Sequence, residues 1–340
     1  MPMHMLDPAG LACLAALAEG GSFERAAQLL SITQSAVSQR LRALESHVGH
    51  LLVVRARPLR LTEPGKILLR YARQLDVLSA DAAQELGACL HREARVPIAV
   101  NADSLATWVL PALDALVQAG QRQGYALELI VDDQDFTHDW LRQGEVLGCV
   151  STVAQALRGC DCQELGVMRY QAVASPHFLA QHLPQGLNRG NFASTPFIVF
   201  NRKDDMQAQW VSQAFEVRGP RLLERFVPSS EAGARAAAMG WGIAVLPELL
   251  ARPAMERGEL CPVLPEVGVD VMLHWHQWRL GSDSAPPPMM RHGLLDQIGR
   301  AILQGSHAAL APATSMTRPG ADNPVHDSLD RGPGQPRAGI

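Results

Sequence analysis

Two groups of polar side chains in the sequence could do chemistry, and the first lies near the N-terminus. It consists of side chains that follow a short break at Ser31-Ile32: Gln34, Ser35, Ser38, Gln39 and Arg42. Amide and guanidinium groups form paired hydrogen bonds with base edges, and serines allow close approach to a duplex. Three further arginines, Arg55, Arg57 and Arg60, surround a predicted turn and suit backbone phosphates. This segment therefore favours contact with nucleic acid.

The second group lies in the rest of the chain, where acids and hydroxyls follow predicted strands or begin predicted helices. Its members are Asp103, Ser104, Asp132, Asp133, Ser151, Asp204, Ser229 and Ser230. Free N–H groups at a helix start fit a carboxylate, whereas buried carboxylates need a positive partner. A ligand with both kinds of group is a basic amino acid. For Asp103 and Ser104 simple helix capping is the alternative, and it is compatible with ligand binding.

Other chemistry has weaker support. Cys160 and Cys162 lack a matching ligand pair elsewhere, so ordinary thiols are favoured over a metal or redox site. His274 and His276 share one strand face, where a core or ligand-lining strand is favoured over a metal pair. The sequence contains no nucleophile elbow, phosphate loop or His-Glu-x-x-His motif. We therefore expect no enzymatic activity, no metal and no cofactor.

Composition limits the class of protein. The 340 residues are 47% hydrophobic with six cysteines, which predicts about two packed domains and no disulfide framework. No apolar run reaches the ~20 residues of a membrane span, and no secretory signal is visible. A cytoplasmic protein without a membrane partner is expected.

The net charge of −4 hides an asymmetry along the chain. From Arg25 to Arg73 nine Lys and Arg residues face two acids, Glu45 and Glu63, which makes this segment +7 and leaves −11 elsewhere. A basic segment joined to an acidic body is the distribution expected when the N-terminal part alone contacts nucleic acid.

The N-terminal elements are predicted from caps and apolar spacing. Helices are expected over 6–19, 23–30 and 34–47, with Ser22 and Thr33 as N-caps, followed by strands over 51–55 and 60–62. A long helix is expected over 66–92, with a coiled-coil seam of Leu68, Tyr71, Leu75, Leu78 and Ala82. A seam on an exposed helix predicts a second copy of the chain as partner.

From Val96 onward strands alternate with helices, which favours an α/β body with a mostly parallel sheet. Helices are expected from Ser104 and around 136–143. The expected strands are 96–100, 126–131, 146–150, 167–174, 197–200, 222–227, 243–246 and 271–275.

Residues 6–65 resemble the winged helix-turn-helix of LysR-type transcriptional regulators. The motifs that carry this resemblance are Ser22-Phe23-Glu24-Arg25-Ala26-Ala27, Thr33 to Leu41, and Leu61-Thr62-Glu63-Pro64-Gly65. Segments 101–108, 141–146, 204–206, 229–232 and 275–276 resemble the ArgP (IciA)/LysG branch of that family, which senses lysine and arginine. The similarity runs from about residue 6 to 303, and Pro64 departs from a more usual small residue.

The resemblance implies an α+β multidomain architecture. A winged helix-turn-helix would occupy 1–65, a linker and dimerisation helix 66–94, a periplasmic-binding-protein-like effector domain 95–304, and a disordered tail 305–340. The effector domain would consist of subdomain I, 95–168 with 266–304, and subdomain II, 169–265. The resemblance also implies that Ala27 packs at the helix crossing, and it adds Trp275 to the effector-binding residues.

The function implied is DNA-binding transcription regulation, with lysine or arginine as effector and a basic-amino-acid exporter or metabolism gene as target. Expected partners are an inverted-repeat operator on double-stranded DNA, RNA polymerase, and further copies in a homodimer or homotetramer. Two alternatives stay open: an architectural DNA-binding protein without effector, and a solute-binding or enzymatic α/β body whose N-terminal domain only dimerises.

Overall fold

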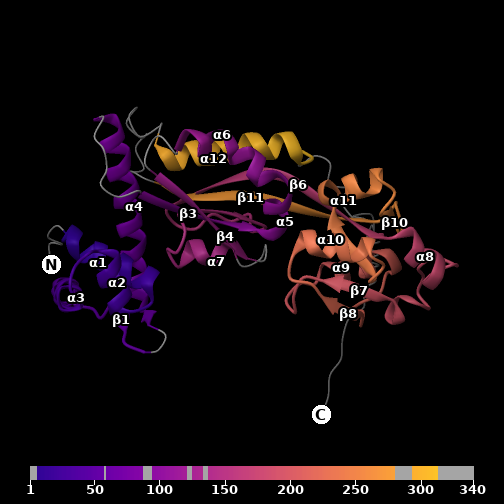
Figure 1. Cartoon of the computed structure of the whole chain (residues 1–340), viewed down its shortest axis with the longest axis horizontal. Helices are drawn as coiled ribbons and strands as arrows, with labels where there is room; N and C mark the ends of the chain where they lie inside the picture. The colour runs from indigo at the N-terminus through magenta and orange to yellow at the C-terminus, as the bar shows by residue number, and fades with distance from the viewer. Residues whose placement is uncertain are drawn as a thin grey trace, which may run out of the picture.

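The computed structural model describes residues 6–56, 59–86, 94–120, 125–132, 137–279 and 293–312. A small helical domain lies at one end of the longest axis, a long helix rises from it across that axis, and two α/β lobes follow along the axis (Figure 1). Below, the helical domain is called the head and the two lobes together the body.

The head consists of α1 (Pro8–Gly20), α2 (Phe23–Leu29) and α3 (Gln34–Val48), with a short hairpin of β1 (Val53–Val54) and β2 (Arg60–Leu61). The Ser22 hydroxyl accepts a hydrogen bond from the Arg25 N–H at 3.2 Å, and the Thr33 hydroxyl accepts one from the Ala36 N–H at 3.1 Å. Both predicted caps are therefore confirmed. Leu14, Leu41 and Leu52 are buried at the centre, and Ala27 packs with them.

Helix α4 (Glu63–Glu85) begins three residues before the predicted start at Lys66. The Thr62 hydroxyl accepts a hydrogen bond from the Gly65 N–H at 3.1 Å, and Pro64 is tolerated because a first helical turn needs no N–H partner. Leu68 is buried in the core of the head, so the prediction that it belongs to an exposed seam is wrong. Tyr71 and Leu75 are exposed, as a seam requires. Residues 87–92, the last part of the predicted helix, lie outside the described residues.

Subdomain I is built on three parallel strands: β3 (Ala94–Asn101), β4 (Tyr125–Asp132) and β5 (Gly148–Ser151). Its helices are α5 (Ala102–Ser104), a π-helical turn (Leu105–Val109), α6 (Leu110–Gly120), α7 (Thr137–Arg142) and α12 (Leu294–Ala309). Helices α6 and α12 pack together over one face (Figure 1).

Subdomain II contains the strands β7 (Pro196–Val199), β8 (Leu223–Phe226), β9 (Ile243–Pro247) and β10 (Cys261–Pro262). Its helices are α8 (Pro176–His182), a 3-10 turn (Phe192–Ser194), α9 (Met206–Phe215), α10 (Ser230–Ala238) and α11 (Glu248–Glu256). Strand β7 pairs in parallel with both β8 and β9.

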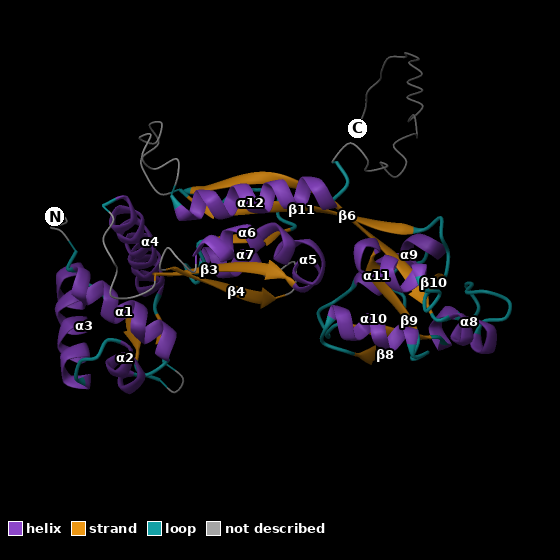
Figure 2. Cartoon of the chain, turned by 45° about the horizontal axis from the view of Figure 1, so that its top comes forward, coloured by secondary structure: helices purple, strands orange, loops and turns teal. Residues whose placement is uncertain are grey.

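Two long strands, β6 (Cys160–Ala174) and β11 (Gly268–Trp278), run through both lobes (Figure 2). They pair antiparallel along their length, so the sheet order is β4-β3-β5-β11-β6-β9-β7-β8. The expectation of a mostly parallel sheet holds within each lobe but is wrong at this junction. The predicted strands 167–174 and 271–275 are too short. Each real strand begins in the core of one lobe and ends in the core of the other, so its apolar pattern changes along its length.

The C-terminal helix also extends further than predicted. Helix α12 continues to Ala309, and Ala311 then pairs with Val167 of β6. Ser306 and Leu310 are buried, and Gly305 fits against Ala112, where a Cβ would approach to 2.2 Å. A tail beginning at 305 is therefore wrong, because small residues here form a packing surface that a search for large apolar residues misses. Residues 313–340 lie outside the described residues.

Candidate functional site

The outer face of α3 carries four exposed side chains from the predicted set, Gln34, Ser35, Gln39 and Arg42, and the half-buried Ser38. The opposite face buries Val37, Leu41 and Leu44 in the core of the head. The polar side chains are therefore held on a rigid helix and point away from the core, the arrangement needed to enter a major groove.

The hairpin of β1 and β2 exposes two of its three predicted arginines. Arg55 is exposed and its guanidinium lies 5.1 Å from the ring centroid of Phe23, at the start of α2. Arg60 is exposed on β2, opposite Val54. Arg57 lies outside the described residues. Arg55 and Arg60 are exposed cations on the hairpin and suit phosphate contacts.

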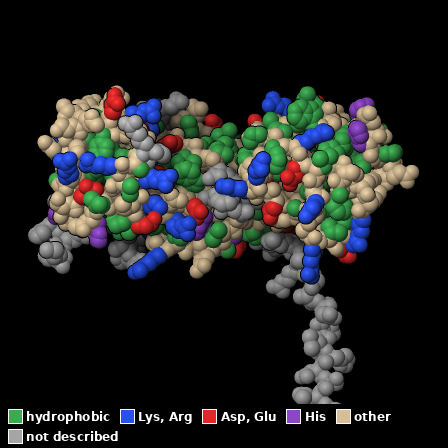
Figure 3. Space-filling model, turned by 90° about the horizontal axis from the view of Figure 1, so that it is seen from below, with side chains coloured by type: hydrophobic (Ala, Val, Ile, Leu, Met, Phe, Trp, Pro, Cys, Tyr) green, Lys and Arg blue, Asp and Glu red, His purple; other side chains and the backbone are tan. Residues whose placement is uncertain are grey.

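A cavity lies between the two subdomains, where the molecular surface is indented (Figure 3). It brings together four of the predicted effector residues: Asp103 from subdomain I, and Asp204, Ser229 and Ser230 from subdomain II. The remaining polar lining comes from Asn101, Tyr170 and Gln207. Elements far apart in the sequence thus meet at one polar site.

Asp103 is the central charged group of this cavity. Its Oδ2 accepts a hydrogen bond from the Tyr170 hydroxyl at 2.7 Å, and its carboxyl group also hydrogen-bonds Ser230 across the cleft. Burial raises the pKa of Asp103 and the neighbouring Asp204 adds to the rise, while the hydrogen bonds from Ser230 and Tyr170 oppose it. An ionised carboxylate here is therefore poorly solvated, and a cation would stabilise it.

Asn101 has the least satisfied side chain of the cavity. It is 2% exposed, and neither amide atom has a hydrogen-bond partner among the described residues. The Gln207 side chain is half satisfied. Its Nε2 donates to the Ile198 carbonyl at 3.0 Å, but its Oε1 has no hydrogen-bond partner within the described chain. Buried polar atoms left unpaired are costly, which favours a polar ligand at this place.

Neither Asn101 nor Gln207 was among the predicted site residues. Asn101 could have been found, since it directly follows the predicted strand 96–100 and lies two residues before Asp103. Gln207 carries no such signal, because it lies inside α9 and only the packing of that helix turns it to the cavity.

Two predicted residues of the cavity, Asp204 and Ser229, also accept backbone hydrogen bonds that stabilise the fold. Asp204 accepts backbone hydrogen bonds from Phe200 and Met206, both at 3.0 Å, and so orders the loop before α9. The Ser229 hydroxyl caps α10 by accepting from the Ala232 N–H at 3.2 Å. Asp103 is consequently the carboxylate most available to a ligand.

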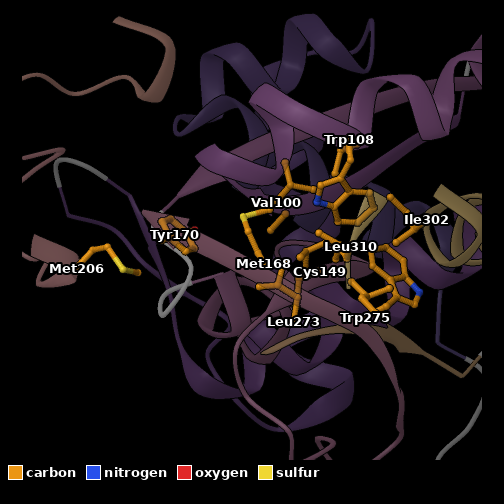
Figure 4. Packing of buried hydrophobic residues seen from close by; sticks show 14 of the residues in the cluster. Val100, Trp108, Cys149, Met168, Tyr170, Met206, Leu273, Trp275, Ile302 and Leu310 are labelled. Carbon is orange, nitrogen blue, oxygen red and sulfur yellow. The ribbon is translucent and has the colours of Figure 1, made fainter. Parts of the chain in front are cut away.

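Three other predicted effector residues are buried away from the cavity lining. Ser151 accepts a hydrogen bond from the Val153 N–H at 3.2 Å, and the Ser104 hydroxyl has no partner among the described residues. Trp275 packs with Ile302 and Leu310, away from Tyr170 and Met206 (Figure 4), and its Nε1 donates to Gln277 Oε1 at 2.7 Å. The expectation that Trp275 binds the effector is thus corrected: its side of β11 faces α12.

Asp132 ends β4, but its side chain lies outside the description, as does all of Asp133. The structure therefore does not bring these two predicted residues into the cavity or exclude them from it.

Two histidines and a cysteine of subdomain I, His138, His276 and Cys162, lie close together. His276 Nε2 lies 2.7 Å from the Val153 carbonyl and 3.6 Å from Cys162 Sγ, and its ring contacts His138 of α7 at 5.0 Å between centroids. Burial lowers the pKa of His276 and raises the pKa of Cys160 to about 12, so both are neutral near pH 7. Within the described part of the chain no three His, Cys, Asp or Glu side chains are arranged to hold a metal ion.

Among the described helices, none is both long enough and apolar enough to cross a membrane.

Comparison with known proteins identifies both parts of the chain. Residues 9–66 match the model of the bacterial regulatory helix-turn-helix protein, lysR family, and residues 91–320 match the LysR substrate binding domain. The HTH-type transcriptional regulator ArgP of Aeromonas salmonicida is 38% identical over 311 residues, which cover 91% of this chain and 100% of that protein.

Two solved structures are similar over most of the chain. The crystal structure of ArgP from Mycobacterium tuberculosis has a TM-score of 0.74 and 37% identity, covering 91% of this chain and 99% of that one. Full-length LysG from Corynebacterium glutamicum with bound effector arginine has a TM-score of 0.66 and 35% identity, covering 90% and 100%.

Proposed function

The chain belongs to the LysR family of bacterial transcription regulators, and from that premise we propose that a basic amino acid in the inter-subdomain cavity controls its binding to DNA. The ligand is lysine or arginine. The arginine-bound LysG relative supports this choice, and so does the chemistry of the cavity. The observation that carries the proposal is the poorly solvated carboxylate of Asp103, which lies between the two subdomains.

The ligand's groups match those of the cavity. A cationic group of the ligand pairs with Asp103 and removes the cost of its burial. The unpartnered amide of Asn101 and the N–H groups at the start of α10 receive the ligand's polar ends, including its carboxylate. Because these groups come from both lobes, the bound ligand holds the lobes together.

On DNA, the outer face of α3 reads base edges in the major groove while Arg55 and Arg60 contact phosphates. The exposed Tyr71 and Leu75 of α4 pack against a second copy, so a homodimer or homotetramer binds an inverted repeat. The target is a basic-amino-acid exporter or metabolism gene, and RNA polymerase is a further partner. The protein acts in the cytoplasm and catalyses no reaction.

A mobility-shift assay tests the proposal with DNA from immediately upstream of the chain's own gene. We expect salt-dependent binding whose affinity or band pattern changes with lysine or arginine and not with neutral amino acids. Binding that no amino acid alters would support an architectural protein instead. An absence of salt-dependent DNA binding would support a solute-binding or enzymatic body with a dimerising head.

A further inference from the structure

Helix α12 ends near α11, and an apolar groove of about 480 Å³ lies between these two helices and the start of α6 (Figure 2). Its walls come from both lobes, since α6 and α12 belong to subdomain I and α11 to subdomain II. We propose that this groove, called the hinge groove, binds residues 313–317 of the same chain, with Met316 as the anchoring side chain. The effect of docking on effector binding rests on the proposed function, whereas the docking itself does not.

The walls of the hinge groove are apolar and uncharged. At the end of α12, Ala308 is exposed and Ala309 is half-buried, while α11 contributes the half-buried Leu249 and Leu250 and the exposed Pro253. None of the described residues that line the groove carries a charge. An uncharged groove of this size that opens to water is suited to an occupant that is itself uncharged and partly apolar.

The chain leaves α12 at the edge of this groove. Ala309 lines the groove, and Ala311 pairs with Val167 of β6 through backbone hydrogen bonds of 2.8 and 3.2 Å. The described chain ends at Pro312, and the four residues from there to Met316 can span up to roughly 13 Å. A tethered segment binds at an effective concentration in the millimolar range, so it has an advantage over any free partner.

Residues 313–317 also match the groove in chemistry. They carry no charge, and Met316 is the first large apolar side chain after Leu310. Methionine is unbranched and polarisable, so it fills irregular apolar gaps well. Charged residues begin at Arg318 and recur through the rest of the sequence, where they suit water and not an apolar groove. The uncharged stretch therefore lies at the point where the chain passes the groove.

The hinge groove and the effector cavity share one segment of subdomain I. Asn101 and Asp103 line the cavity, and the π-helical turn that follows them places Thr107 and Trp108 in the groove. The Thr107 hydroxyl donates to the Asp103 carbonyl at 2.6 Å, which joins the two sites directly. A segment bound to α6, α11 and α12 holds the lobes together, as does a ligand between them. Docking should therefore strengthen effector binding.

The test compares four chains: the wild type, a shortened chain that ends at Pro312, and the full-length variants Met316→Asp and Val325→Asp. Both substitutions introduce the same charge in place of an apolar side chain, one at the anchor and one further along, so Val325→Asp is the matched control. Hydrogen exchange is measured without ligand on the amides of α11 from Arg252 to Glu256. The shortened chain keeps every described residue, so its packed core is intact.

We expect the α11 amides to exchange at least about threefold faster in the shortened chain and in Met316→Asp, while Val325→Asp keeps the wild-type rates. In the wild type, the amides of Met316 and Thr317 should be protected at least about tenfold relative to an unstructured peptide. Equal α11 exchange in all four chains would overturn the docking. Protection of α11 that is lost on dilution, and not on removal of residues 313–340, would assign the groove to a second copy and overturn it as well.

Calorimetry with arginine measures the coupling between the groove and the cavity. Arginine affinity should be about threefold lower in the shortened chain and in Met316→Asp, and unchanged in Val325→Asp. Equal arginine affinity in all four chains would overturn the coupling. If the wild type binds neither arginine nor lysine, the proposed function fails, while the exchange result still decides whether residues 313–317 occupy the groove.

Discussion

The face of α3 and the inter-subdomain cavity use charge in opposite ways. The α3 face is formed by residues 34–42 of one helix and is mostly exposed. The cavity is formed by residues between Asn101 and Leu246 of both lobes, and its central carboxylate is poorly solvated. Exposed charges act over several ångströms and are weakened by salt, whereas a desolvated charge acts at contact distance and selects its partner. We therefore expect salt to govern DNA binding and ligand charge to govern the cavity.

The largest effect is expected from Asp103→Asn, which keeps an acceptor for the Tyr170 hydroxyl but removes the charge. Arginine affinity should fall by about 30-fold or more, because a buried charge pair loses one partner. Calorimetry measures the loss, and Asp114→Asn on the exposed side of α6 is the control. Wild-type affinity in Asp103→Asn would show that the cavity does not select by charge.

Arg42→Ala should weaken operator binding by about tenfold at moderate salt, since an exposed side chain of the reading helix is lost. Arginine affinity should not change, because Arg42 lies in the head. Anisotropy titrations measure the first quantity and calorimetry the second. Unchanged operator affinity would refute the assignment of α3 as the reading helix.

Arg60→Ala should have a smaller and less specific effect. Loss of one phosphate contact should lower affinity for operator and unrelated DNA alike, by a few-fold, and reduce the salt slope by about one. Titrations at several salt concentrations measure the slope. A loss restricted to the operator would place Arg60 on base edges instead.

The exposed face was well predicted because its determinants are local. Ser22 and Thr33 cap their helices with N–H groups only three residues away, and the apolar spacing of Val37, Leu41 and Leu44 orients α3 by itself. Such signals survive in any stretch of sequence, whatever surrounds it.

The cavity was predicted only in part because it depends on how distant elements meet. Asp103 and Ser230 were recognised at helix starts, but their mutual hydrogen bond requires two lobes to face each other. Trp275 was misassigned because alternation on β11 leaves both faces buried, and only the position of α12 decides which neighbours it has. The full length of β6 could not be predicted from the sequence either, because one half of the strand packs in the core of subdomain I and the other half in the core of subdomain II.

The smallest expected effect is a pH dependence of the cavity, where Asp103 titrates. Because burial raises the pKa of Asp103, the folded chain keeps this proton at a pH where the unfolded chain has lost it. The contribution of Asp103 to apoprotein stability therefore improves as pH falls through the raised pKa, while arginine affinity declines. Thermal unfolding of wild type and Asp103→Asn from about pH 4 to 7, with and without arginine, measures both trends. Identical pH profiles for the two chains would contradict this assignment.

The central claim is that the cavity recognises a basic amino acid through the half-buried, poorly solvated carboxylate of Asp103. Calorimetry of the full-length wild-type chain with arginine and with citrulline, its uncharged isostere, tests that claim most directly. The account predicts measurable binding of arginine and at least about tenfold weaker binding of citrulline. Equal affinity for the two, or no binding of arginine and lysine, would contradict it.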